Sequence, residues 1–296
     1  MFALHAAVAP TVKHTPMILQ GSNPHAAPSV LPAALLASVL GNRHLIVQMA
    51  RREIAGRYRG SMMGLAWSFF NPVFMLVVYT FVFSVVFKAR WNVGSTSKTE
   101  FALVLFAGLI VFNLFSECIT RSPSLILANV NYVKKVVFPL EVLPWVALGS
   151  ALFHFLISLV VWIIAYCIFF GLPQATVLLL PLVVIPLMLF TVGISWALAS
   201  LGVFFRDVSQ FVGLLMTVLM FLSPIFYPAS AIPIEYRHYL NLNPLTLAIE
   251  QMRNLLFWGK FDGYGTLFFY SIGALASASA GFAWFQKTRK GFADVL

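Results

Sequence analysis

Long apolar stretches, interrupted by short groups of charged residues, make up most of this sequence. A helix rises about 1.5 Å per residue, so about 20 apolar residues match the roughly 30 Å hydrocarbon core of a bilayer. The pattern therefore predicts an all-α membrane protein with six transmembrane helices. The predicted spans are residues 62–87, 101–119, 143–170, 176–205, 208–227 and 264–285.

Two of these spans have features of their own. The fifth is short and stops at the break formed by Ser223 and Pro224. The last span carries small residues, which allow close approach of a second helix. They are Gly273, Ala276, Ala280 and Gly281.

Residues 35–61 mix basic and apolar positions and are too polar to cross a membrane. Helices of this composition lie in the plane of the membrane interface, with their apolar side in the lipid. We therefore expect an amphipathic interface helix here. The alternative is an ordinary cytoplasmic helix that packs on the rest of the protein.

Two further segments are too polar to span. Residues 122–143, bounded by Pro123 and Pro139, are expected to form one compact helix at the cytoplasmic surface. Residues 228–262 are too apolar for a plain loop and too charged for a span. Irregular backbone at membrane depth survives where protein or a cavity surrounds it, so we expect re-entrant helices at the outer leaflet.

The composition supports a multi-pass membrane protein. Of 296 residues, 60% are hydrophobic and 9% are charged, and the mean hydropathy is +0.90, which is too apolar for a soluble globule. The formal net charge is +10, but basic residues gather at the ends of apolar stretches, where lipid headgroups lie. We therefore expect membrane lipids, and no nucleic acid, as partners. Cys118 and Cys167 lie in apolar stretches and are expected to be small buried hydrophobes.

Lysine and arginine are divided unequally between the two sides of this topology. Those that fall outside are Lys88, Arg90, Lys98, Arg237, Arg253 and Lys260, and all the others fall inside. An excess of Lys and Arg marks the cytoplasmic side, so both termini are expected there. Residues 1–34 are expected to be a flexible cytoplasmic tail, 62–290 the transmembrane domain and 291–296 a cytoplasmic C-terminal tail.

Ionisable side chains inside the spans are candidates for function because they are costly in a bilayer. Arg121 follows Glu117 by one helical turn, which favours a structural ion pair at i,i+4. His154 has no carboxylate near it in sequence. A neutral histidine bonded to a neighbouring helix is favoured over a proton relay.

Four arginines stand together before the first span: Arg51, Arg52, Arg57 and Arg59. They exceed what orientation needs, and arginine suits bidentate contacts with phosphate. We predict that they bind lipid phosphate, with a purely topological role as the alternative. The sequence contains no GxxxxGK[ST], HExxH or GxSxG motif and no paired aspartates suited to metal-assisted catalysis. The chain is therefore expected to be neither an enzyme nor a metal or nucleotide binder.

Three groups of motifs carry a family resemblance. The first is Arg51–Arg52–Glu53 with Arg57–Tyr58–Arg59–Gly60–Ser61, Trp67 and Pro72; the second is residues 129–141; the third is residues 204–207, 223–228, 243–245 and 250–253. In order and spacing they resemble the ABC-2 type permeases that export lipid-linked polysaccharides, such as O-antigen, capsule and teichoic acid. The resemblance covers roughly residues 35–290.

This resemblance implies the ABC-2 exporter fold and a permease subunit in the bacterial inner membrane, where it takes part in lipopolysaccharide or capsule biosynthesis. It implies a homodimer with two copies of a separate ATPase, which would hold ATP and Mg, and no cofactor in this chain. The arginines would then bind the phosphates of the polysaccharide's lipid carrier. The expected ATPase-coupling residues are Asn129, Tyr132, Lys134, Lys135 and Glu141, and the expected periplasmic gate residues are Ser223, Pro224, Tyr227, Asn243 and Pro244.

Aromatic residues recur on one face of the first span, namely Trp67, Phe70, Phe74 and Phe81. Sugar rings stack on aromatic side chains through their apolar faces, so these residues are predicted to line a glycan channel. The alternative is packing against helices or lipid. Two other functions stay open: an ABC-2 exporter of a drug or small lipid, and an intramembrane enzyme of polysaccharide assembly, which the missing acid pairs disfavour.

Overall fold

Helices form every regular element of the part of the chain that the structure describes. The computed structural model describes residues 32–87, 91, 98–134, 138–261 and 263–296, and these contain no β-strand. The all-helical prediction is confirmed. The tail expected at residues 1–34 lies almost entirely outside the described residues.

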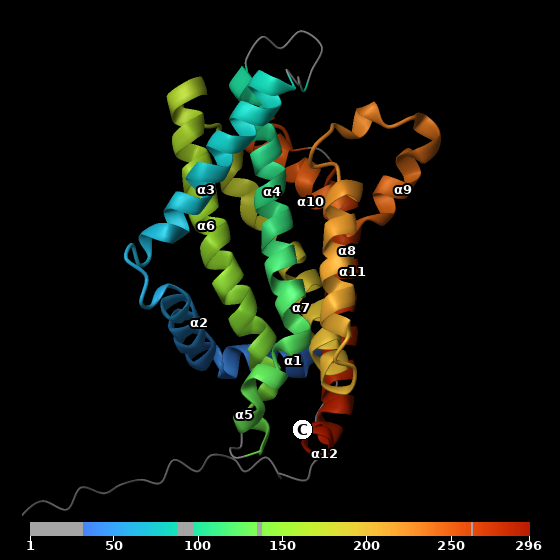
Figure 1. The fold of residues 1–296 in the computed structure, drawn as a ribbon. Helices are drawn as coiled ribbons and strands as arrows, with labels where there is room; N and C mark the ends of the chain where they lie inside the picture. Colours follow the sequence, from blue (N-terminus) through green and yellow to red (C-terminus); the bar gives the residue numbers. More distant parts are fainter. Residues whose placement is uncertain (1–31, 88–90, 92–97, 135–137, 262) are drawn as a thin grey trace, which may run out of the picture.

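The long helices form one bundle (Figure 1). Its α-helices are α1 (Pro32–Gly41), α2 (Arg43–Tyr58), α3 (Ala66–Tyr79), α4 (Lys98–Arg121), α5 (Val130–Lys134), α6 (Leu143–Phe170), α7 (Leu180–Phe204), α8 (Val208–Leu222), α9 (Arg237–Leu242), α10 (Pro244–Arg253), α11 (Tyr264–Thr288) and α12 (Phe292–Val295). A π-helix, Thr80–Val86, extends α3, and a second one, Asn254–Trp258, extends α10.

Five helical segments in the described residues are long and apolar enough to cross a membrane. They are Ala66–Phe83, Thr99–Ser124, Leu140–Phe170, Ala175–Phe204 and Tyr264–Val295. The expected fifth span is α8, whose 15 residues extend about 22 Å and fall short of a bilayer core. It ends because Pro224 disfavours helical backbone at Ser223, which is extended at φ −81° and ψ 145°. The structure therefore supports five full-length spans and one short helix, where the sequence predicted six spans.

The centre of the bundle is α4, which contacts α3, α6, α7, α8 and α10. Every residue from Phe101 to Phe112 is buried. By contrast, Ser68 is the one buried residue of α3, which lies along the edge of α4 and α6. Apolar surface of α3 is thus left for lipid or another chain.

Glycines bring α7 and α11 into the closest contact of the bundle. A Cβ at Gly281 would overlap the carbonyl of Gly193, so neither position has room for a side chain. The buried stripe of α11 is Ala274, Ala278 and Gly281. Of the expected packing face, Gly281 is confirmed, but Gly273, Ala276 and Ala280 are exposed, because they lie about 130° around the helix from the buried stripe.

The N-terminal segment is two helices, where the sequence predicted one. Asn42 separates α1 from α2 with non-helical backbone at φ −102° and ψ 11°, and its side-chain amide donates to the Ser38 carbonyl at 2.8 Å. An Asn side chain that hydrogen-bonds to a nearby backbone carbonyl competes with the backbone hydrogen bonds that would continue the helix. The second helix packs across α6, where Ala50 faces Gly149.

The described parts of the segment 122–143, residues 122–134 and 138–143, form several short turns, so the prediction of one compact helix is wrong. It contains 3-10 turns at Ser122–Ser124, Leu127–Asn129 and Leu140–Val142, and the five-residue α5 between them. Proline lacks the N–H that helix continuation needs, and Pro123 and Pro139 stand at either end. The segment lies at the same end of the bundle as α12 (Figure 1).

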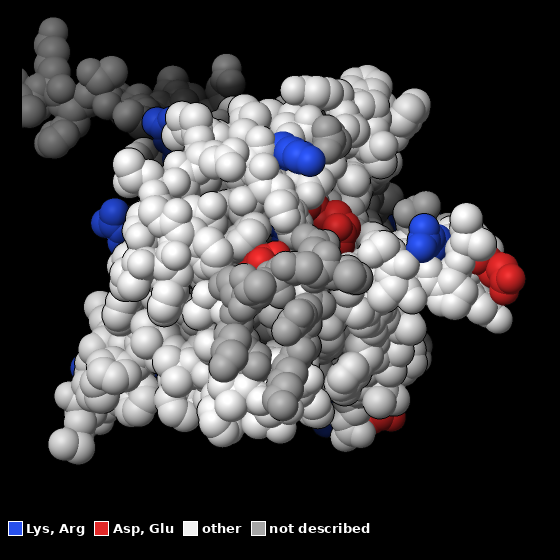
Figure 2. Space-filling view, turned by 90° about the horizontal axis from the view of Figure 1, so that it is seen from above, with Lys and Arg blue, Asp and Glu red and all other residues white. Residues whose placement is uncertain are grey.

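At the opposite end, the chain after α8 forms short helices, as expected for residues 228–262. The 3-10 turns Ala229–Ala231 and Ile234–Tyr236 and helix α9 form an arm that projects from the bundle, while α10 packs against α4 (Figure 1). Viewed from above, most of the surface is uncharged, and basic and acidic side chains lie apart from each other on the projecting arm (Figure 2). Of the two cysteines, Cys118 is buried as expected, but Cys167 is exposed, because it lies on the open side of α6.

Candidate functional site

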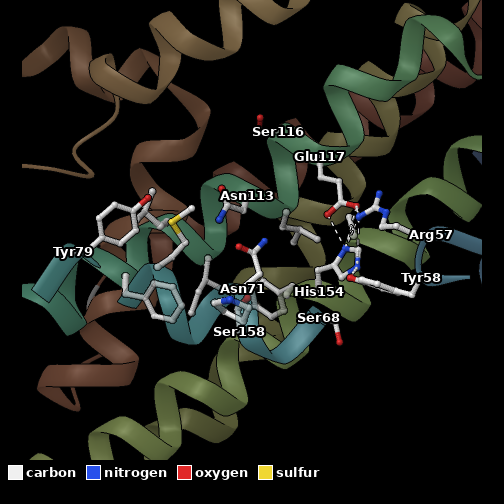
Figure 3. Close-up of a pocket in the computed structure, with 18 residues that line it drawn as sticks. Arg57, Tyr58, Ser68, Asn71, Tyr79, Asn113, Ser116, Glu117, His154 and Ser158 are labelled. Carbon is white, nitrogen blue, oxygen red and sulfur yellow. Dashed lines mark hydrogen bonds and ion pairs between the residues drawn. The ribbon is translucent and has the colours of Figure 1, made fainter. Parts of the chain in front are cut away.

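A polar cavity of about 380 Å³ opens between α3, α4 and α6, with the end of α2 at one side (Figure 3). Its volume falls in the range of about 300–1,000 Å³ typical of ligand pockets. Its polar lining comprises Arg57, Tyr58, Ser68, Asn71, Tyr79, Asn113, Ser116, Glu117, His154 and Ser158. Such a concentration of polar groups among apolar helices marks a candidate site.

Helical periodicity explains how these side chains converge. Residues one turn apart lie on the same face of a helix, and each of the three helices presents such a row to the cavity. The rows are Asn71, Met75 and Tyr79 on α3; Asn113, Ser116 and Glu117 on α4; and His154 and Ser158 on α6. The sequence shows each row, but the convergence of the three depends on how the helices pack.

A cluster of four ionisable residues closes one end of the cavity (Figure 3). The Glu117 carboxylate lies 2.7 Å from Arg57 Nη1 and 2.9 Å from His154 Nδ1. The Tyr58 hydroxyl lies 3.0 Å from His154 Nε2. In one tautomer, His154 donates from Nδ1 to Glu117 and accepts at Nε2 from Tyr58. Burial raises the pKa of Tyr58 although Arg57 opposes the rise, so its hydroxyl is protonated and can donate.

The expected pair of Glu117 with Arg121 is present but is the longest of these contacts, at 3.9 Å. Arg121 instead has Glu53 of α2 as its close partner. His154 is bonded to neighbouring helices, as expected, and its partner is the carboxylate that sequence proximity did not show. Glu53 and Arg57 are one turn apart, so two ion pairs attach α2 to α4.

Two amides in the cavity have no partner. Within the described residues, no hydrogen bond involves the side chain of Asn71 or Asn113. Each amide can donate two hydrogen bonds and accept at its oxygen. Asn71 and Asn113 lie inside the candidate spans Ala66–Phe83 and Thr99–Ser124, where water is scarce. They are available to a ligand.

The four predicted phosphate-binding arginines are divided by the structure. Arg51, Arg52 and Arg59 are exposed on or beside α2 and make no ion pair with another described residue. Arg57 turns to the cavity, where Glu117 neutralises it. The first three therefore present free positive charge, while Arg57 belongs to the cluster.

The predicted channel aromatics lie on a face of α3 adjacent to the cavity. Trp67, Phe70, Phe74 and Phe81 have between 47% and 63% of their surface exposed. Trp67 and Phe70 meet edge to face, with ring centroids 6.5 Å apart. No described segment of the chain covers this face, which agrees both with a channel wall and with a lipid-facing surface.

The predicted coupling residues do not all face outward. Asn129 donates to the Leu125 carbonyl at 2.8 Å, and Tyr132 stacks on Phe138 with centroids 4.4 Å apart. Lys134 contacts the Leu296 carbonyl. Glu141 has 13% of its side chain exposed and pairs with Arg289 at 3.1 Å, so it joins this segment to the end of α11. Lys135 lies outside the described residues.

Two of the predicted gate residues, Ser223 and Asn243, are hydrogen-bonded to each other, and the others have separate contacts. The buried Ser223 hydroxyl accepts from Asn243 Nδ2 at 2.8 Å, and Asn243 Oδ1 caps α10 by accepting from Leu245 N at 3.0 Å. Pro244 occupies the first turn of α10, where its missing N–H costs nothing. Tyr227 donates to the Phe221 carbonyl at 3.0 Å, and the Pro224 carbonyl also has a partner.

That partner is Arg253, which sequence reasoning placed in the segment but did not single out. Its fully buried guanidinium donates to the carbonyls of Val104 at 3.0 Å, Pro224 at 2.5 Å and Ile225 at 2.8 Å. Glu250 pairs with it at 3.0 Å, and the guanidinium lies 4.3 Å from the centre of the Trp91 ring. Burial lowers the pKa of Arg253 to about 10, which leaves it charged at neutral pH.

Signals for these unpredicted contacts were weak in the sequence. Glu250 and Arg253 are one turn apart, which indicates a pair, but nothing local indicates carbonyls on α4 or at the end of α8. A Cβ at Gly108 would lie 2.8 Å from Arg253 Nη2, so a glycine in α4 makes room for the guanidinium. The described residues hold no group of three or more His, Cys, Asp or Glu side chains arranged to bind a metal.

Comparison with known proteins gives a consistent result. The family model described as ABC-2 type transporter matches residues 44–257. The chain is 30% identical over 254 residues to an O-antigen export system permease protein, RfbA, of Klebsiella pneumoniae, covering 85% of this chain and 95% of the relative. An RfbA of Myxococcus xanthus is 30% identical over 261 residues, 86% of this chain and 96% of that one. The polysialic acid transport protein KpsM of Escherichia coli is 26% identical over 242 residues, covering 79% and 90%.

Proposed function

Since the chain belongs to the ABC-2 type transporter family, we propose that it is the permease subunit of an ABC transporter that exports a lipid-linked polysaccharide. The observation that carries the proposal is similarity along nearly the whole length of relatives named for O-antigen and polysialic acid export. The motifs that match lie in both halves of the chain. A drug or small-lipid exporter would share the fold, but no relative found here is named for such a substrate.

The chain supplies the path, and a separate ATPase supplies the energy. The sequence has no phosphate-binding loop of its own, so ATP and Mg belong to a partner subunit. The turns of segment 122–143 and α12 lie together at one end of the bundle and form a surface for that partner. Two permeases with two ATPases complete the proposed transporter, in the inner membrane of a bacterium with both termini in the cytoplasm.

The short α8 is the fifth crossing in this proposal. The extended residues after it and the buried α10 reach the remaining depth of the outer leaflet. Arg253 satisfies the carbonyls that the break at Pro224 leaves without helical donors, which keeps irregular backbone tolerable in a membrane. The group Ser223, Pro224, Tyr227, Asn243 and Pro244 is thereby the fixed base of a gate whose moving part is the arm.

The carrier's phosphates bind Arg51, Arg52 and Arg59 in this proposal. Arg51 and Arg52 are exposed in the middle of α2 and Arg59 is exposed at its C-cap, next to Arg57 and Tyr58, which line the polar cavity. Arginine forms bidentate, charge-assisted hydrogen bonds with phosphate, and an amphipathic helix at the interface meets the headgroup region. Arg57 contributes to the cavity wall instead.

Deletion of the gene in its host, followed by complementation, tests the function. We expect the deletion to remove a surface polysaccharide and to accumulate its lipid-linked form inside the cell. The intact gene should restore export. The same gene should not restore export when the partner ATPase carries a substitution that prevents ATP hydrolysis. Unchanged surface polysaccharide in the deletion strain would contradict the proposal.

A further inference from the structure

We infer that the polar cavity between α3, α4 and α6 is a subsite for the neutral sugar units next to the lipid phosphate. The inference rests on the proposed function and adds the place and the chemistry of sugar recognition. Nothing in the relatives' names assigns this cavity. It differs from the aromatic face of α3, which was the sequence-based candidate for glycan contact.

The first step is the placement of amides. Within the candidate spans, the Asn side chains are Asn71 and Asn113, and both line this cavity. An amide at membrane depth costs free energy unless it is hydrogen-bonded. Neither has a protein partner in the described part of the chain. A pair of unpaired amides in one cavity therefore points to a ligand that supplies both donors and acceptors.

The second step is charge. Arg57 and Glu117 neutralise each other at 2.7 Å, and His154 hydrogen-bonds to Glu117 and Tyr58. A phosphate in the cavity would meet the Glu117 carboxylate, and a cation would meet Arg57. Hydroxyl groups, which both donate and accept, suit Asn71, Asn113, Ser116 and Ser158 without adding charge.

The third step is location. The cavity begins at Arg57 and Tyr58, at the end of the helix that carries the exposed Arg51, Arg52 and Arg59. In this proposal, a phosphate held at Arg59, which directly follows Tyr58, places its attached sugar at the cavity mouth. The polar rows of α3 and α4 then continue from Ser68 to Tyr79 along the direction of the spans (Figure 3).

Thiol protection tests the subsite in the permease and ATPase complex in lipid nanodiscs. The parent protein carries Met75→Cys in the cavity, with Cys118→Ala and Cys167→Ala. The probe is an oligosaccharide released by mild acid from the host's own lipid-linked glycan and freed of lipid and phosphate. We expect it to slow the reaction of the cysteine with a small water-soluble thiol reagent by about fivefold or more, whereas inorganic pyrophosphate leaves the rate unchanged.

Variants of the two amides distinguish hydrogen bonding of the sugar from simple steric shielding of the cysteine. Asn71→Leu with Asn113→Leu should raise the half-protecting oligosaccharide concentration by about tenfold, because two hydrogen-bonding groups are lost. Asn71→Ser with Asn113→Ser keeps hydroxyls and should lose less. Gln210→Leu, which removes an exposed amide of α8 outside the cavity, should match the parent. Equal labelling rates without sugar show that the variants keep the fold.

Three results would overturn the inference: no protection by the oligosaccharide, equal protection by pyrophosphate, or unchanged protection in both double variants. Export is measured separately in cells. Export without protection removes the subsite and leaves the proposed function standing. A deletion strain that still exports its polysaccharide removes the proposed function, whatever the labelling shows.

Discussion

Buried charge at Arg253 holds together segments that are far apart in the sequence. Its guanidinium donates to the carbonyl of Val104 in α4 and to the carbonyls of Pro224 and Ile225, which follow the end of α8 and have no helical donor. In a membrane protein these groups cannot turn to water. The side chain therefore acts as a structural centre for the end of the molecule that carries the arm.

Replacing Arg253 with Met should destabilise the protein strongly. Each buried carbonyl left without a donor costs about 1–3 kcal/mol, so we expect the apparent unfolding temperature in detergent to fall by about 5–10 °C. Arg237→Met is the matched control, because Arg237 also donates to two carbonyls but is exposed. Equal unfolding temperatures for the two variants would contradict the role of Arg253.

Free arginines on α2 lead to a second prediction at this scale. Arg51→Lys with Arg59→Lys keeps charge and topology but removes the bidentate geometry, so export should fall about three- to tenfold. Arg43→Lys, at the start of the same helix, should leave export unchanged. Surface polysaccharide measured in the complemented deletion strain gives the result. Full export in the double variant would leave these arginines with topology alone.

Residue-scale prediction from sequence had a clear limit. Glu117 and His154 were recognisable as candidates because they are ionisable and lie in apolar stretches. Their partnership was not, because 37 positions separate them and the contact forms only when α4 packs on α6. Arg121, the neighbour in sequence, proved to be the more distant partner of Glu117.

At the scale of elements, periodicity and length predicted the long helices well, since apolar runs of that length have few other solutions in a bilayer. The packing face of α11 was predicted correctly at Gly281 and wrongly at Gly273, Ala276 and Ala280, because small residues occur on two faces of this helix. The prediction of one compact helix for the segment 122–143 was also wrong. Its prolines indicated its ends, but composition cannot distinguish a helix from successive short turns.

Packing between α7 and α11 gives a direct test of the corrected face. Gly281→Leu inserts a side chain against the Gly193 carbonyl, so it should cost about 1–3 kcal/mol and reduce the yield of monodisperse protein. Gly273→Leu, on the exposed face of the same helix, should be tolerated because a Cβ there meets no atom within 4 Å. Size-exclusion profiles and unfolding temperatures compare the two. Equal damage at both positions would contradict the assigned face.

The segment 122–143 is expected to bind the ATPase. Lys134→Glu with Lys135→Glu reverses two charges and should reduce co-purification of the ATPase by about tenfold, because charge reversal penalises a complementary interface. Lys287→Glu, an exposed charge near the end of α11, is the control. Retention of the ATPase and of transport at parental levels by the double variant would contradict this docking surface.

At the scale of the whole molecule, the arm at residues 229–242 and the turns of segment 122–143 lie at opposite ends of the bundle (Figure 1). The proposed topology puts the arm on the periplasmic side of the inner membrane and those turns on the cytoplasmic side. A gate must also change position during transport, so the arm should differ between states. Both claims depend on the same crossing by the short α8.

Labelling of a cysteine at Ala231 tests both claims. With Cys118 and Cys167 replaced, Ala231→Cys should react with a membrane-impermeant reagent added on the periplasmic side of the inner membrane, and Lys290→Cys should not. Trapping the ATPase with ATP should change the rate at Ala231→Cys. Labelling of that position from the cytoplasm alone would contradict the six-crossing topology, and identical rates in every state would contradict the gate.

The connection between α2 and α3 has a mechanical consequence. Gly60 and Gly64 have φ of 85° and 51°, conformations that other residues rarely adopt, so the turn between the helices has a defined shape. Helix α2 is anchored to α4 by two ion pairs, whereas α3 has only one buried residue. Because α2 is held and α3 is not, we expect small displacements of α2 at headgroup level to change the tilt of α3 in the membrane.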